Sequence, residues 1–178
     1  LALTASATPR VQDEIVERLQ LADPARFVGS FARENLVLGL RMADNKGARM
    51  LDLFRRVPGS ALVYLRSRRK VEQWSDWLRR RGVSAQAYHA GLPPEQRHDR
   101  QEAWMSGATR VMVCTTAFGM GIDKGDVRLV LHLDAPESLE AYYQEAGRAG
   151  RDGKRAWAAM FLDAGDRRSL AERMQAGP

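Results

Sequence analysis

Glycines and arginines alternate in one segment near the end of the sequence. Residues 144–151 read QEAGRAGR, which sets Arg148 and Arg151 three positions apart. That spacing allows both side chains to project from one face of a helix, while the glycines lower helix propensity and indicate a close backbone approach. Two guanidiniums that converge on one point suit a triphosphate, because an arginine stabilises charge developing on a transferred phosphoryl group. Two solvated arginines beside a helix end are the alternative.

A second glycine-bearing segment follows an apolar run. Residues 115–123 read TTAFGMGID. In an open parallel sheet, ligands bind outside the carboxyl ends of the strands, so we expect this loop to lie beside a ligand. Its hydroxyls and backbone N–H groups suit phosphate oxygens, Gly121 permits close approach, and Asp123 can accept a hydrogen bond from a sugar hydroxyl. An ordinary glycine-rich turn is the alternative, because the spacing does not match the dinucleotide-binding fingerprint.

Short apolar runs alternate with helical patterns along the chain. The runs cover residues 61–65, 85–88, 111–115, 127–133 and 156–162. Most are continuous, as expected for strands buried on both faces of a parallel sheet. One helical pattern ends at Gly82, another begins at Pro93 and Pro94, and Ser138 can cap a third. The alternation predicts an α/β domain with three α/β/α layers and a mostly parallel central sheet.

The beginning of the chain follows a different pattern. Thr8 and Pro9 suit an N-cap and a first helical position, and apolar residues recur at helical spacing after them. A helix that begins so early suggests a chain cut inside a larger protein. We therefore expect residues 1–21 to end a preceding domain, residues 22–35 to be a linker and residues 36–178 to form the domain itself.

Composition excludes several classes of protein. With 44% hydrophobic and 28% charged residues among 178, the chain is typical of globular rather than disordered proteins. It has no run of about eighteen apolar residues, so no membrane span is expected. The single Cys114 excludes an internal disulfide framework and a zinc site built from cysteines. A net charge of +6 favours a polyanionic partner such as nucleic acid, although a basic surface that only keeps the protein solvated is equally consistent.

Five segments, taken in order, resemble motifs of superfamily 2 helicases in their RecQ form. Residues 3–7, 63–68, 88–92, 117–124 and 144–153 are similar to the third, fourth, IVa, fifth and sixth motifs. The DEAD-box RNA helicases share the architecture, but the phenylalanine and methionine of the fifth motif and the YYQE run before the sixth favour RecQ. The resemblance implies a RecA-like fold and a place as the second motor domain of an ATP-dependent, 3′-to-5′ DNA helicase.

The same resemblance implies roles for individual residues. Arg151 would be the arginine finger that reaches ATP, with Arg148 close behind it. Gln144, Asp123 and Gly121 would bind the nucleotide or couple its state to the arginines, with Asp123 near the ribose. The backbone of single-stranded DNA would be held by a further set: Ser67, Arg68, His89, Gly91 and Thr115. No metal ligand is expected in this chain.

The motifs that hold nucleotide phosphates and Mg²⁺ do not occur in these 178 residues: there is neither a GxxxxGK[ST] loop nor an Asp-Glu-x-His motif. We therefore expect ATP with Mg²⁺ to be bound mainly by the first RecA-like domain, and this chain to be inactive alone. The expected partners are that domain and single-stranded or partly duplex DNA in the bacterial cytoplasm, at the nucleoid, in repair or recombination. Two alternatives stay open: the second domain of an RNA helicase and a non-catalytic nucleic-acid-binding module.

Overall fold

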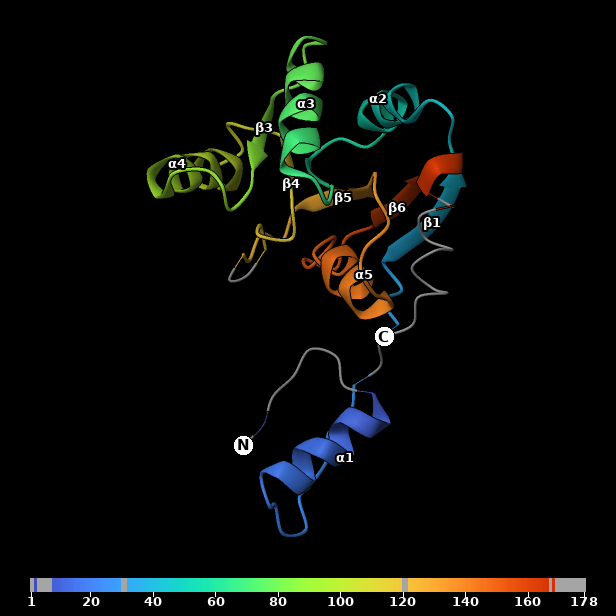
Figure 1. The fold of residues 1–178 in the computed structure, drawn as a ribbon, viewed down its shortest axis with the longest axis vertical. Helices are drawn as coiled ribbons and strands as arrows, with labels where there is room; N and C mark the ends of the chain where they lie inside the picture. The colour runs from blue at the N-terminus through green and yellow to red at the C-terminus, as the bar shows by residue number, and fades with distance from the viewer. Residues whose placement is uncertain (1, 3–7, 30–31, 120–121, 167, 169–178) are drawn as a thin grey trace. The chain divides into compact units, whose positions relative to one another are not determined.

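The computed structural model of the chain describes residues 2, 8–29, 32–119, 122–166 and 168. The chain divides into two compact units, Leu1–Glu34 and Asn35–Pro178 (Figure 1). Two sequence predictions fall outside the described residues: the likeness of residues 3–7 to a third helicase motif, and the role of Gly121.

The first unit contains helix α1 (Pro9–Arg18). The Thr8 hydroxyl accepts a hydrogen bond from the Val11 N–H at 3.4 Å, and a proline occupies the first turn, where no N–H is needed. The predicted start of this helix is confirmed. None of its residues is buried, so its apolar stripe is uncovered by the described part of this unit.

The second unit is built on a six-stranded, fully parallel sheet. Its strands are β1 (Leu36–Met42), β2 (Ser60–Tyr64), β3 (Ala85–Tyr88), β4 (Val111–Cys114), β5 (Val127–His132) and β6 (Ala156–Leu162). They lie in the order β1-β6-β5-β2-β4-β3. The apolar runs predict the last five correctly. Strand β1 was missed although residues 36–40 read LVLGL; at the edge of the sheet most of its residues are exposed.

Helices cover both faces of the sheet, which confirms the three-layer α/β/α prediction (Figure 1). The helices are α2 (Lys46–Arg56), α3 (Arg68–Arg79), α4 (Pro94–Met105) and α5 (Leu139–Ala146). Helices α2 and α3 pack on the face that contains Ala61 and Val63, whereas α4 and α5 pack on the face that contains Leu62 and Tyr64. Successive residues of β2 therefore enter opposite layers, as the alternation of a strand requires.

Parallel pairing brings the segments singled out in the sequence to a common edge. Because all strands point the same way, the loops that follow β2, β3, β4 and β5 leave from the same carboxyl-terminal edge of the sheet. The motif-like segments occupy these loops, and helix α5 then leads toward the two arginines.

Gly47 provides a test of the packing between α2 and α3. A Cβ atom there would lie 2.7 Å from Cζ2 and 2.8 Å from Cη2 of Trp77. We expect Gly47→Ala to lower the free energy of unfolding by up to about 2 kcal/mol, because an overpacking cost of about 1–3 kcal/mol outweighs a gain of at most roughly 1 kcal/mol in helix propensity. Chemical denaturation of this chain would measure the change.

Gly39→Ala is the matched control, since its new Cβ would meet only the Ala159 Cβ at 4.0 Å. This variant should unfold at or above the midpoint of the unchanged chain. A Gly47→Ala variant that is as stable as Gly39→Ala would contradict the packing argument.

Candidate functional site

Arg148 and Arg151 lie in the tight turns that follow helix α5. The helix ends at Ala146, and the Arg148 N–H then donates to the Glu145 carbonyl, only three residues back, at 3.2 Å. Gly150 has a φ of +63°, and its N–H donates to the carbonyl of Val127 at 2.9 Å. The expectation of two arginines on one helical face is therefore wrong, because the glycines end the helix and turn the chain before Arg151.

Asn35, which is more than a hundred residues earlier in the sequence, is hydrogen-bonded to this turn. Its Nδ2 donates to the carbonyls of Gly150 at 2.8 Å and Lys154 at 2.9 Å, and its own carbonyl accepts from the Ala156 N–H at 2.9 Å. The bonds join the start of the second unit to the loop that carries the arginines. Sequence reasoning placed Asn35 in the linker and gave it no role.

Arg148 folds against the loop that resembles the fifth motif. Its Nη1 donates to the Gly119 carbonyl, and the charge of the same guanidinium acts to lower the pKa of the nearby Tyr64 hydroxyl, against the larger effect of burial. Gly119 has a φ of +149°, and a side chain there would overlap the Arg148 guanidinium. Arg148 Nε is buried and has no hydrogen-bond partner among the described residues. Glycine is therefore required at position 119 by both its backbone and its neighbour.

Arg151 contacts the same loop further along and is more exposed. Its Nη1 donates to the Ile122 carbonyl at 2.8 Å and to Asp123 Oδ1 at 3.2 Å. The side chains of Arg151 and Asp123 are 37% and 87% exposed. An ion pair this exposed contributes at most about 1 kcal/mol. The structure thus brings Arg151 and the predicted nucleotide residue Asp123 together, while Gln144 is exposed on helix α5.

Polar groups are buried beneath the arginines. Burial raises the pKa of the Tyr64 hydroxyl well above its usual value, as it does for the Cys114 thiol at the end of β4. The ring of His132 stacks on Tyr64, with centroids 5.3 Å apart, and His132 Nε2 lies 2.6 Å from Glu145 Oε2. These contacts join β2, β5 and α5, and sequence reasoning identified none of them.

The residues predicted to hold nucleic acid lie at the carboxyl ends of β2, β3 and β4. The Ser67 hydroxyl caps α3, whose first residue is the exposed Arg68. A Cβ on Gly91 would lie 3.0 Å from Arg68 Nη1 and 3.2 Å from His89 Nδ1. Arg68, at the start of α3, is therefore a neighbour of His89 and Gly91 in the loop after β3.

His89 and Thr115 connect this group to the adjacent strands. His89 is buried, and its Nε2 lies 3.0 Å from Glu72 Oε1, which orients the ring. Its Nδ1 has no hydrogen-bond partner in the described part of the chain. The Thr115 N–H donates to the Tyr88 carbonyl at 3.1 Å, so the end of β4 adjoins the strand that precedes His89.

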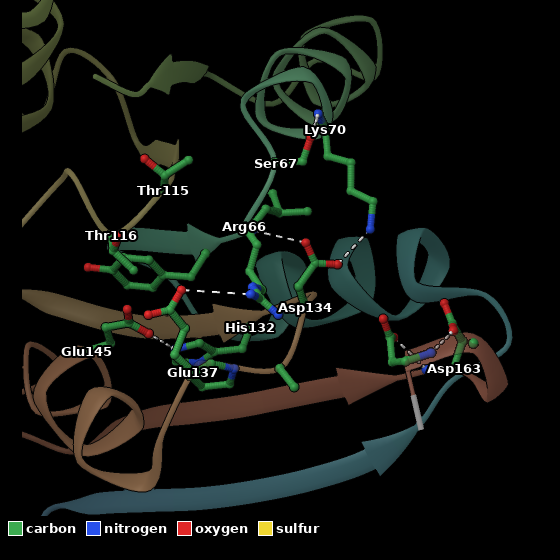
Figure 2. A pocket seen from close by; sticks show the side chains of 16 residues that line it. Arg66, Ser67, Lys70, Thr115, Thr116, His132, Asp134, Glu137, Glu145 and Asp163 are labelled. Atoms are coloured by element: carbon green, nitrogen blue, oxygen red, sulfur yellow. Dashed lines mark hydrogen bonds and ion pairs between the residues drawn. The ribbon is translucent and has the colours of Figure 1, made fainter. Parts of the chain in front are cut away.

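A pocket of about 660 Å³ opens beside this group at the carboxyl ends of β2, β4 and β5 (Figure 2). Ser67 and Thr115 line it together with several carboxylates. Asp134 accepts from the Arg66 N–H at 3.0 Å and from Lys70 Nζ at 2.8 Å, a bond that raises the pKa of Lys70. Glu137 lies 3.8 Å from the Arg66 guanidinium. Internal cations thus offset the carboxylates of this wall.

Within the described ranges, no three His, Cys, Asp or Glu side chains are grouped so that they could hold a metal ion. No helix in that part of the chain is long and apolar enough to cross a bilayer.

Comparison with known proteins identifies the family of this domain. Residues 45–153 match the family described as the helicase conserved C-terminal domain. The chain belongs to this family. The matched range runs from the N-cap of α2 through the turns that carry both arginines, so it includes the fourth-motif, IVa, fifth-motif and sixth-motif segments.

Full-length relatives identify the branch of the family. The chain is 45% identical over 170 residues to the ATP-dependent DNA helicase RecQ of Pasteurella multocida, covering 93% of this chain and 26% of that protein. It is 41% identical over 155 residues to the ATP-dependent DNA helicase RecQ of Bacillus subtilis, with 86% and 26% covered. The RecQ-like DNA helicase blm-1 of Caenorhabditis elegans is 39% identical over 183 residues, with 99% and 18% covered.

These matches confirm the resemblance: this helicase C-terminal domain is of the RecQ type and has the RecA-like α/β fold of superfamily 2. The chain spans about a quarter of the length of the bacterial relatives.

The reactivity of Cys114 reports whether the buried region around the end of β4 in this RecQ-type domain opens to solvent. Burial, reinforced by the negative charge of Glu145, raises the pKa of its thiol, so little reactive thiolate exists near pH 8. We expect Ellman's reagent to label the folded chain at least about a hundredfold more slowly than the denatured chain, which corresponds to a local opening free energy of roughly 3 kcal/mol. Because the chain has a single cysteine, all labelling comes from Cys114. Equal rates in the folded and denatured chain would show that the region around Cys114 opens freely.

Proposed function

We propose that this domain is the second motor domain of an ATP-dependent DNA helicase that moves 3′ to 5′ along one strand. Residues 36–178 would form the motor domain, residues 22–35 the linker and residues 1–21 the end of the first motor domain. The observation that carries the proposal is the pair of guanidiniums held on the fifth-motif loop, of which Arg151 extends to the surface.

Arg151 is our choice for the arginine finger. It is held by one backbone carbonyl and an exposed carboxylate, and a phosphate group offers shorter, charge-assisted bonds to both arms of a guanidinium. Arg148 is bound by the Gly119 carbonyl and its Nε is buried, so its release costs more. Arg148 would therefore hold the loop in place and make the second contact with the phosphates.

ATP with Mg²⁺ is the nucleotide of the proposed reaction. The two guanidiniums fit its phosphates, whereas the described residues group no metal ligands, so the first RecA-like domain would supply the Mg²⁺ ligands. Asp123 would turn to the ribose when Arg151 leaves it, and Gln144 would relay the state of the nucleotide to the arginine turn. Gly121 would let the backbone approach closely. When bound, ATP supplies the phosphoryl group whose developing charge Arg151 stabilises.

Single-stranded DNA would cross the carboxyl ends of β2, β3 and β4. Arg68 offers an exposed cation there, the Ser67 and Thr115 hydroxyls can donate to phosphate oxygens, and His89 Nδ1 can do the same when protonated. The absence of a side chain at Gly91 lets the Arg68 guanidinium lie against this loop. Contacts of this kind fix the position of a strand without reading its bases, as a translocating motor requires.

In the whole protein, ATP binding would draw the two motor domains together and bring Arg151 onto the triphosphate. Hydrolysis would let them separate. Alternating grip on the DNA backbone would then advance the motor along one strand. We propose that this takes place on chromosomal DNA in the bacterial cytoplasm, in repair or recombination.

The Arg151→Ala variant of the full-length protein tests the finger. We expect DNA-stimulated ATP turnover to fall by roughly a thousandfold with ATP binding retained, because an arginine finger acts on the transition state. Arg56→Ala is the matched control: its side chain lies on α2, 73% exposed and paired with Asp52, and turnover should stay unchanged. Unchanged turnover in Arg151→Ala would transfer the assignment to Arg148, and unchanged turnover in both variants would reject catalysis by this domain. Stronger stimulation by RNA than by DNA would favour the RNA helicase alternative.

The proposed DNA-binding surface at the carboxyl ends of β2, β3 and β4, called the DNA track below, predicts that loss of one of its cations weakens DNA binding in a salt-dependent way. We expect Arg68→Ala to weaken binding of single-stranded DNA equally for all sequences and to reduce the slope of log affinity against log salt by roughly 0.7, the value for one phosphate contact on a single strand. Arg79→Ala, at the other end of α3 and paired with Asp76, is the control and should leave the slope unchanged. Fluorescence anisotropy over a salt series would measure both variants, and binding that is insensitive to salt would contradict the track.

A further inference from the structure

Glu145 is a buried carboxylate on a helix that packs against the sheet. Its side chain is 9% exposed, and it lies in the last turn of α5, three residues before Arg148. An apolar residue would pack on this face at no electrostatic cost, whereas a buried carboxylate is costly unless it is well hydrogen-bonded. Packing alone therefore does not explain an acid at this position.

The partner of Glu145 is the last residue of strand β5. His132 Nε2 lies 2.6 Å from Glu145 Oε2, and the His132 side chain is 1% exposed. Its other ring nitrogen, Nδ1, has no hydrogen-bond partner among the residues that the structure describes. A hydrogen bond has a preferred length and direction, so this pair fixes the end of α5 along the axis of β5 more tightly than a sliding apolar contact would.

Contacts around the pair lead directly to Arg148. The ring of Tyr64 stacks on His132 with an interplanar angle of 18°. The Tyr64 hydroxyl donates to the Phe118 carbonyl at 3.2 Å, and the next carbonyl of that loop, at Gly119, accepts from Arg148 Nη1. Arg148 is thus held from two sides: through its backbone by the α5 end that Glu145 fixes, and through its side chain by the Phe118–Gly119 loop that Tyr64 also contacts.

The pair also borders the predicted DNA track. Figure 2 shows the His132–Glu145 hydrogen bond among the side chains of the pocket that Ser67 and Thr115 also line. One group of buried contacts therefore joins the surface proposed for DNA to the turn that carries the arginines. Such a group can transmit a change only if its members have defined positions, which buried polar bonds provide.

We propose that His132 and Glu145 are positioning residues that set the arginine turn on strand β5 and couple it to the DNA track. The proposal rests on the proposed motor function. It assigns the pair no contact with ATP or DNA: the pair acts by holding Arg148 and the following turn where Arg151 can reach the triphosphate. Removing the pair would then lower the rate of catalysis more than the affinity for ATP or DNA.

The test uses the full-length protein with His132→Leu and His132→Gln. Leucine removes the donor at similar volume, whereas the Gln side-chain amide can donate from near the position of His132 Nε2. We expect His132→Leu to lower the DNA-stimulated kcat roughly tenfold, the size of effect seen for residues that couple two sites. The KM for ATP and the DNA concentration for half-maximal stimulation should stay within about twofold. His132→Gln should restore most of the lost kcat.

His98→Leu, an exposed histidine on α4, is the matched control and should behave as the unchanged protein. A purely structural role would lower the unfolding midpoint in both His132 variants without rescue of kcat by glutamine, and that result would overturn the proposal. An unchanged kcat in a folded His132→Leu variant would overturn it as well.

Two further measurements keep the outcomes distinct. If His132→Leu does not fold, Glu145→Met replaces it, since this change removes the oxygen acceptor that orients His132 at similar length; an unchanged kcat there would reject the pair. Arg151→Ala is measured in parallel. Lost turnover in Arg151→Ala with normal turnover in the His132 variants would reject the positioning pair alone, whereas normal turnover in Arg151→Ala and Arg148→Ala would reject the motor function on which it rests.

Discussion

Parallel pairing around strand β2 is the constraint on which the rest of this domain depends. Strand β2 lies between β4 and β5, and every one of its residues is buried. Its register is therefore set by both neighbours and by the helices on both faces, and a slip of one residue would exchange the two layers of the core. Fixing β2 in this way fixes the edge from which the following loops leave, and the candidate residues inherit their positions from that edge.

The two arginines differ because the loop beneath them changes from buried to exposed along its length. Near Gly119 the loop is packed under α5, and Arg148 is bound to a backbone carbonyl beside the buried Tyr64. Near Asp123 the loop has reached solvent, and Arg151 shares an exposed ion pair. The loop thus binds Arg148 firmly near Gly119 and Arg151 weakly about three residues further on. On the proposed function, the weakly attached arginine is the one that can change partners during each cycle.

The sequence predicted the layers well because burial is encoded locally. Continuous apolar runs marked β2 to β6, and Thr8 and Ser138 marked two helix starts by capping chemistry that needs only neighbouring residues. Strand β1 and helix α2 were missed. Residues 36–40 read LVLGL, an apolar run like those of the other strands, yet at the sheet edge most of the strand is exposed. The prediction that both arginines share one face of a helix was wrong. The three-residue spacing favours such a face, but the glycines of this segment end the helix.

The polar contacts of the site could not be predicted from neighbouring residues, because they join segments that are far apart in the sequence. Asn35 bonds to residues more than a hundred positions away, and Tyr64 meets His132 only because β2 and β5 are neighbours. A histidine that ends an apolar strand, read alone, is indistinguishable from one that merely fills space. Glu145 carries the better signal, since a carboxylate beside an alanine on the packed face of a helix conflicts with its surroundings, and such conflicts between local preference and fold concentrate at functional sites.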